Sequence, residues 1–142
     1  MKPVLVFVYG TLKRPYGNSR LLEYSSRLVG DAVTVGKYYL ANCGIPYLVC
    51  DYLLKGDKVD MGKPVLGQVW EVYDEQTMST LDALEGVRYN HYQHLELFVS
   101  LETGLGEVVK ALAYHTGDPD VQEYGPSNVI MINGKEVYQW ER

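Results

Sequence analysis

The chain has 142 residues, of which 46% are hydrophobic and 22% charged, and its formal net charge at pH 7 is −5. This length and composition predict a single domain, 1–142, with enough apolar side chains for one core. The negative charge argues against a nucleic acid or an anionic membrane as partner, because both select clustered Lys and Arg. The N-terminus lacks the basic region and long apolar core of a signal peptide, so we expect a cytoplasmic protein.

The first predicted strand, residues 4–9, is apolar on both faces and is therefore expected at the centre of a sheet or barrel. It runs into the segment Tyr9-Gly10-Thr11-Leu12. Because glycine has no Cβ, another molecule can approach the backbone there, and neighbouring N–H groups can converge on an anion. The segment is a candidate ligand loop; the alternative is that Gly10 merely ends a core strand.

Further strands are predicted over residues 26–40 with a break near Gly36, and over 46–50, 65–73, 93–101 and 107–115. Residues 51–64, rich in Gly, Lys and Asp, indicate a surface excursion. Near the end, Asn133-Gly134 between two apolar runs predicts a hairpin, which would pack against the ligand pocket or mediate self-association. Strands mixed with only two short helices predict an α+β fold built on a small mixed β-barrel or sheet.

One of these helices is predicted over residues 74–85. Asp74 is a suitable N-cap, Glu75 suits the positive end of the helix dipole, and Gly86 is placed to end the helix in the left-handed conformation.

Glu85 is the candidate catalytic residue on the longer helix. At about 100° per residue, Met78, Leu81 and Leu84 share one apolar stripe, and Glu85 falls between the directions of Met78 and Leu81. Desolvation and the helix dipole would both raise the pKa of such a carboxyl, which suits a group that accepts and returns a proton near neutral pH. The alternative is a structural ion pair with Arg88.

The remaining reactive residue types show no site pattern. Cys43 and Cys50 match neither a zinc nor a redox spacing, so both are predicted to be buried free thiols. The histidines add no metal-ligand spacing, and no metal site is expected. Most of the 13 Tyr residues are expected in the core, and Tyr92 either borders the cleft of Glu85 or is one more core tyrosine.

Four segments together resemble the gamma-glutamylcyclotransferase-like family: the run from Val6 to Arg14, Gly67-Gln-Val-Trp-Glu-Val, Leu81-Asp-Ala-Leu-Glu-Gly and Tyr92-Gln-His. Their order agrees with the family over residues 4–115. Asn18 matches a family Asn that precedes a short helix, so the resemblance implies a second helix near residues 19–22. The chain departs at His94, where the family usually has Arg, and it matches poorly from about residue 123.

The resemblance implies an enzyme, of lyase or transferase type, that releases 5-oxoproline from a gamma-glutamyl amine such as gamma-glutamyl-lysine. The substrate's own α-amine would attack, so no cofactor is expected. Glu85 would be the general acid and base, and Tyr9, Gly10, Thr11, Leu12 and Tyr92 would bind the small-molecule substrate. Two alternatives remain open: a non-catalytic binding or interaction module of the same fold, and a gamma-glutamyl-peptide processing enzyme of a biosynthetic pathway. The sequence is compatible with a monomer or a homodimer.

Overall fold

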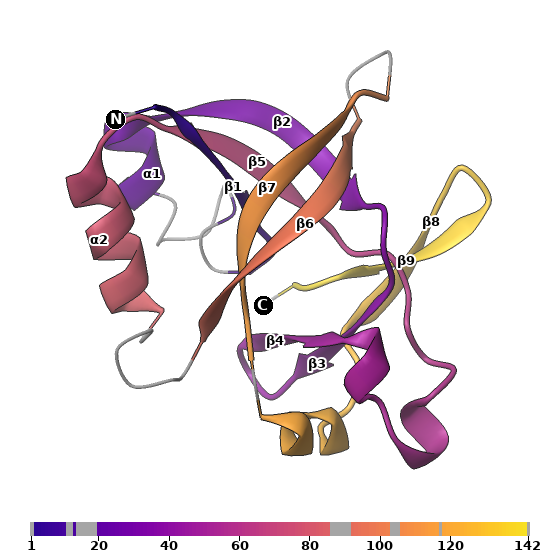
Figure 1. Ribbon diagram of the computed structural model, residues 1–142. Coiled ribbons are helices and arrows are strands. Elements are labelled where there is room, and N and C mark those ends of the chain that lie inside the picture. The colour runs from indigo at the N-terminus through magenta and orange to yellow at the C-terminus, as the bar shows by residue number, and fades with distance from the viewer. Residues whose placement is uncertain are drawn as a thin grey trace.

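The computed structural model describes residues 2–10, 13, 20–85, 92–102, 106–116 and 118–141. Its centre is a closed barrel of strands in the order β1-β5-β2-β6-β7 (Figure 1). The barrel strands are β1 (Val4–Val8), β2 (Ser26–Thr34), β5 (Leu66–Val72), β6 (Gln93–Leu101) and β7 (Val108–His115). Strands β1 and β7 run parallel, and the other neighbours are antiparallel. The expected α+β class with a small mixed barrel is confirmed.

Strand β1 lies between β5 and β7, and it buries both of its faces. Phe7 packs into the large cluster of apolar side chains that fills the barrel. Val6 and Val8 point the other way, into a smaller cluster that they share with Leu22 and Leu81 of the helices. A strand with both faces buried needs apolar residues at every position, so the continuous apolar run correctly predicts its central place.

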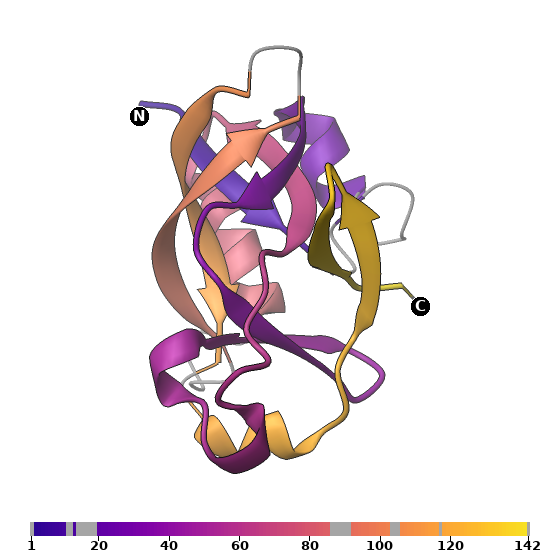
Figure 2. The same cartoon turned by 90° about the vertical axis from the view of Figure 1, so that its right-hand side faces the viewer.

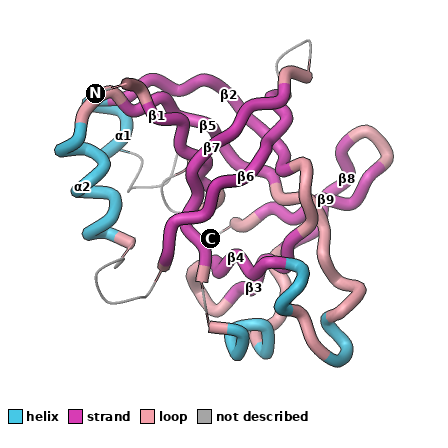
Figure 3. Tube along the Cα trace, viewed as in Figure 1, coloured by secondary structure: helices cyan, strands magenta, loops and turns pink. Residues whose placement is uncertain are grey.

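The two helices lie together on one side of the barrel, at the left in Figure 1 and in cyan in Figure 3. They are α1 (Arg20–Ser25) and α2 (Glu75–Leu84). The hydroxyls of Ser25 and Thr77 lie 2.6 Å apart and join them. Within the described part of the chain, neither helix has the length and apolar character needed to cross a membrane.

Helix α2 begins as its sequence predicts, because the Asp74 carboxylate accepts a hydrogen bond of 2.7 Å from the Thr77 backbone N–H. Its buried residues are Thr77 and Leu81. Leu84 is 46% exposed, so its predicted place on the apolar stripe is wrong. The surface of α2 that packs against the barrel is narrower than the predicted stripe of Met78, Leu81 and Leu84, and Leu84 lies outside this surface.

Two hairpins complete the fold, one at the lower end of the barrel and one on the side away from the helices (Figures 1 and 2). One pairs β3 (Tyr38–Asn42) with β4 (Pro46–Cys50), and the other pairs β8 (Asn128–Ile132) with β9 (Lys135–Gln139). At the tip of the second, Asn133 and Gly134 have φ of 50° and 79°, the left-handed turn that their sequence predicts. Short 3-10 helices follow β4 and β7: η2 (Asp51–Leu53), η3 (Gly56–Lys58) and η5 (Pro119–Glu123).

The break predicted near Gly36 is confirmed, because β2 ends at Thr34 and β3 begins at Tyr38. The two strands belong to different sheets, β2 to the barrel and β3 to a separate hairpin. The structure corrects one further expectation. Cys43 is exposed, whereas Cys50 is buried as expected, and both are free thiols. Cys43 lies in the tight connection between β3 and β4, where its backbone N–H bonds to the carbonyl oxygen of Ile45, so its side chain stays at the surface.

Candidate active site

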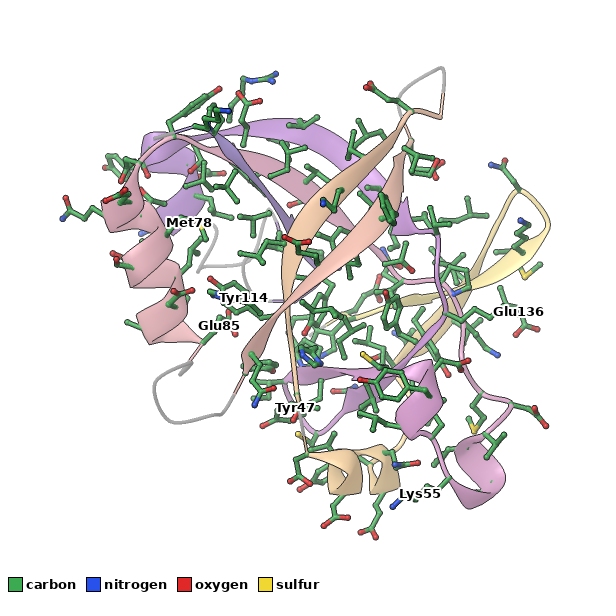
Figure 4. All side chains as sticks on the ribbon, viewed as in Figure 1. Tyr47, Lys55, Met78, Glu85, Tyr114 and Glu136 are labelled. Carbon is green, nitrogen blue, oxygen red and sulfur yellow. The ribbon has the colours of Figure 1, made fainter. Side chains whose placement is uncertain are left out.

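Glu85 stands at the C-terminal end of α2, and its backbone N–H donates to the Leu81 carbonyl oxygen at 2.9 Å. Figure 4 shows its side chain on the side of the helix that faces the barrel, next to Tyr114 of β7. Burial raises the pKa of the carboxyl to about 7. A group with this pKa is present in both protonation states at neutral pH, as proton transfer requires.

Three tyrosines lie near enough to this carboxyl to feel its charge. The charge of Glu85 contributes to raising the pKa values of Tyr9, Tyr92 and Tyr114, with burial as the larger cause in each. Their hydroxyls are therefore protonated at neutral pH and donate to other acceptors. Tyr9 donates to the carbonyl oxygen of Tyr114, Tyr92 to that of Pro46, and Tyr114 to a carboxylate of α2. All three tyrosines are themselves buried, which agrees with burial as the cause of the raised pKa of Glu85.

Gly10 is packed against the start of β4. A Cβ at this position would lie 2.6 Å from Cγ of Pro46, closer than side chains approach each other. Packing alone therefore requires glycine here, and the approach of a ligand at Gly10 stays a prediction. The backbone N–H of Lys13 donates to the Gly10 carbonyl oxygen at 3.0 Å, which closes a turn after the strand.

Pro46 also connects this turn to the segment that follows α2. Its carbonyl oxygen accepts the hydroxyl of Tyr92, which is itself buried. The rings of Tyr92 and Tyr47 stack with centroids 5.3 Å apart and planes inclined by 21°. The start of β4 therefore contributes an aromatic and proline surface between Gly10 and Tyr92.

At the position where the chain departs from the family pattern, His94 contacts α2. Its Nε2 lies 2.7 Å from Oδ1 of Asp82, and the Tyr114 hydroxyl donates to the same oxygen at 2.6 Å. The rings of His94 and Tyr114 meet edge to face, with centroids 5.4 Å apart. His94 is therefore placed to hold the last turn of α2 against the barrel.

Lys13 is a buried cation directly after the candidate loop. Its side chain is 7% exposed, and burial lowers its pKa. The Nζ atom donates to the carbonyl oxygen of Trp140 at 2.9 Å, so the end of the chain after β9 reaches back to the loop. This contact favours the first of the two roles predicted for the C-terminal hairpin, packing near the pocket.

The structure brings together four of the six predicted site residues, which are Tyr9, Gly10, Glu85 and Tyr92. The other predicted positions lie outside the described residues: Thr11, Leu12, Asn18, Gly86 and Arg88. Sequence reasoning missed Asp82, Tyr114 and Lys13. Asp82 precedes Glu85 by three positions, a helical spacing that would have shown their proximity. Tyr114 carries no local signal among 13 tyrosines.

Comparisons with known proteins agree with this architecture. The family model described as "Gamma-glutamyl cyclotransferase, AIG2-like" matches residues 6–135. A protein of Methanocaldococcus jannaschii named "Putative gamma-glutamylcyclotransferase" is 31% identical over 99 residues, which are 70% of this chain and 74% of that protein. One of Arabidopsis thaliana with the same description is 41% identical over 93 residues, 62% of this chain and 46% of the plant protein, so the chain matches less than half of that relative's length. The crystal structure of an AIG2-like protein from Mus musculus superposes with a TM-score of 0.71 at 29% identity, covering 89% of this chain and 86% of that one.

Proposed function

Since the chain belongs to the gamma-glutamyl cyclotransferase, AIG2-like family, we propose that it releases 5-oxoproline from a gamma-glutamyl amine. The observation that carries this proposal is the Glu85 carboxyl, which lies near Tyr9 at the end of β1 and has a pKa raised by burial to about 7. A carboxyl with that pKa can take a proton from one nitrogen and give it to another without a cofactor.

The reaction forms one bond and breaks another within the substrate. The α-ammonium of the glutamyl group first gives a proton to the Glu85 carboxylate. The free α-amine then attacks the side-chain carbonyl carbon, which forms the C–N bond of the five-membered ring. The bond from that carbon to the leaving nitrogen breaks as this nitrogen takes the proton from Glu85. The ring nitrogen then loses its second proton, which the restored carboxylate accepts and passes to the released amine. The products are 5-oxoproline and the amine in its protonated form, and Glu85 is again a carboxylate.

Because the nucleophile belongs to the substrate, the protein's main task is to hold the glutamyl group in the folded shape. Such positioning can supply about 7–11 kcal/mol of the barrier. We assign the binding of the α-carboxylate to backbone N–H groups of Gly10, Thr11 and Leu12, since backbone donors bind anions without a basic side chain. Tyr9 and Tyr92, both buried beside Glu85, would form the wall against which the glutamyl chain lies.

The direct test is release of 5-oxoproline from gamma-glutamyl-ε-lysine, gamma-glutamyl-alanine and glutathione, measured in parallel. We expect gamma-glutamyl-ε-lysine to be the best of the three. The control is gamma-glutamyl-ε-lysine in which the α-amine of the glutamyl group is acetylated. This compound cannot close the ring and should be inert. Free lysine released from the acetylated compound would indicate hydrolysis instead. Binding of all three without turnover would favour the non-catalytic module.

A further inference from the structure

The last turn of α2 carries both Glu85 and Asp82, and Asp82 bonds to the barrel through its side chain. One carboxylate oxygen, Oδ1, receives the Tyr114 hydroxyl at 2.6 Å and lies 2.7 Å from Nε2 of His94. His94 and Tyr114 are directly opposite each other in the β6–β7 pairing. Two neighbouring strands of the barrel therefore hold the helix at one atom.

Tyr114 makes a second contact with its backbone. Its carbonyl oxygen accepts the hydroxyl of Tyr9, the residue directly before Gly10. The same residue thus bonds to the helix that carries Glu85 through its side chain, and to the end of β1 through its main chain. Its neighbour Ala113 is fully buried in the core, so Tyr114 stands on a packed strand of the closed barrel.

We propose that Tyr114 is a positioning residue that sets the place of the Glu85 carboxyl relative to the Tyr9-Gly10 turn, with Asp82 as its partner on α2 and His94 as the support of that partner. The inference rests on the proposed function and deepens it. Displacement of a reacting group by about 1 Å can lower the rate of the chemical step about 10²-fold. A contact of this kind therefore matters more for turnover than for folding.

The exposure of Asp82 and His94 supports an effect on turnover rather than on folding. The side chains of Asp82 and His94 are 34% and 43% exposed, and ion pairs open to water add little to folding stability. Loss of the Tyr114 hydroxyl should thus leave the barrel folded while the end of α2 gains freedom. The Glu85 carboxyl would then reach water more often, which should lower its pKa toward the ordinary value.

The test is Tyr114→Phe, which removes the hydroxyl but keeps the ring and the carbonyl oxygen that Tyr9 needs. We expect kcat to fall about 10- to 100-fold with KM changed less than about threefold. The pKa of Glu85, followed by carbon-13 NMR of its carboxyl, should fall from about 7 toward 4.5. Asp82→Ala should reproduce both effects, and the double variant should add little to either. Asp82→Asn, which keeps an oxygen acceptor, should retain most of the activity.

Tyr138→Phe is the matched control. Tyr138 is fully buried, and its hydroxyl donates to the Met61 carbonyl oxygen at 2.6 Å, so the variant loses a comparable bond in the hairpin region. Its kcat and the Glu85 pKa should stay at wild-type values even if its stability falls. A Tyr114→Phe protein with the kcat and the Glu85 pKa of this control overturns the proposal. If Tyr114→Phe does not fold, the same two measurements on Asp82→Ala test the proposal. If the wild type releases no 5-oxoproline, the proposed function fails, and an unchanged Glu85 pKa in the variants would separately refute the positioning role.

Discussion

Replacing Glu85 with Gln should stabilise the protein at pH 8 and leave its stability nearly unchanged at pH 4. The pKa of Glu85 rises from 4.5 to about 7 through burial. Between these two values the unfolded chain has lost the proton while the folded chain still holds it. Stability therefore falls as pH rises from about 4.5 to 7 and stays low above 7. A pKa change of this size corresponds to about 3 kcal/mol, and Gln, which does not ionise, should be free of this loss.

The assay is urea unfolding of both proteins at half-unit steps from pH 4 to pH 8.5. The difference in the free energy of unfolding, variant minus wild type, should rise from about zero to about 3 kcal/mol across this range. Glu75→Gln is the control, because it removes the same charge from an exposed position at the other end of α2. A difference that is constant with pH, or a Glu85→Gln variant that is less stable than the wild type at pH 8, would refute the claim that Glu85 is held in a desolvated place.

Two further outcomes are expected. Gly10→Ala should destabilise the fold by about 1–3 kcal/mol, because the added methyl would lie 2.6 Å from Pro46 Cγ, and it should also weaken substrate binding. The control is Gly125→Ala, whose methyl would meet nothing within 4 Å. Equal urea midpoints for the two variants would contradict the packing argument. The ionised Glu85 must take the first proton, so kcat/KM should rise with pH through about 7, and a profile that is flat from pH 5.5 to 8.5 would argue against this role.

Features with local causes could be predicted from the sequence. The apolar run 4–9 indicated a central strand, Asp74 marked the start of α2, and Asn133-Gly134 fixed the second hairpin. Each of these signals depends on a few neighbouring residues and their backbone preferences. The orientation of Glu85 toward the barrel also followed from helical spacing alone.

What could not be predicted depends on contacts between distant segments. Tyr114 lies beside α2 because of the order in which the strands close the barrel. No local sequence pattern contains this order. The burial of Lys13 follows from the return of Trp140 at the other end of the chain. The exposure of Leu84 likewise reflects the width of the contact between α2 and the barrel, which the helical stripe does not specify.

The central claim is that the Glu85 carboxyl transfers the proton in ring closure. The most direct measurement is the rate of 5-oxoproline release by Glu85→Gln, with substrate affinity measured on the same protein by calorimetry. Gln keeps the size and shape of the side chain but cannot exchange a proton, so turnover should fall by about 10²–10⁴ while affinity changes only a few-fold. A folded Glu85→Gln protein that turns over at the wild-type rate would contradict this mechanism.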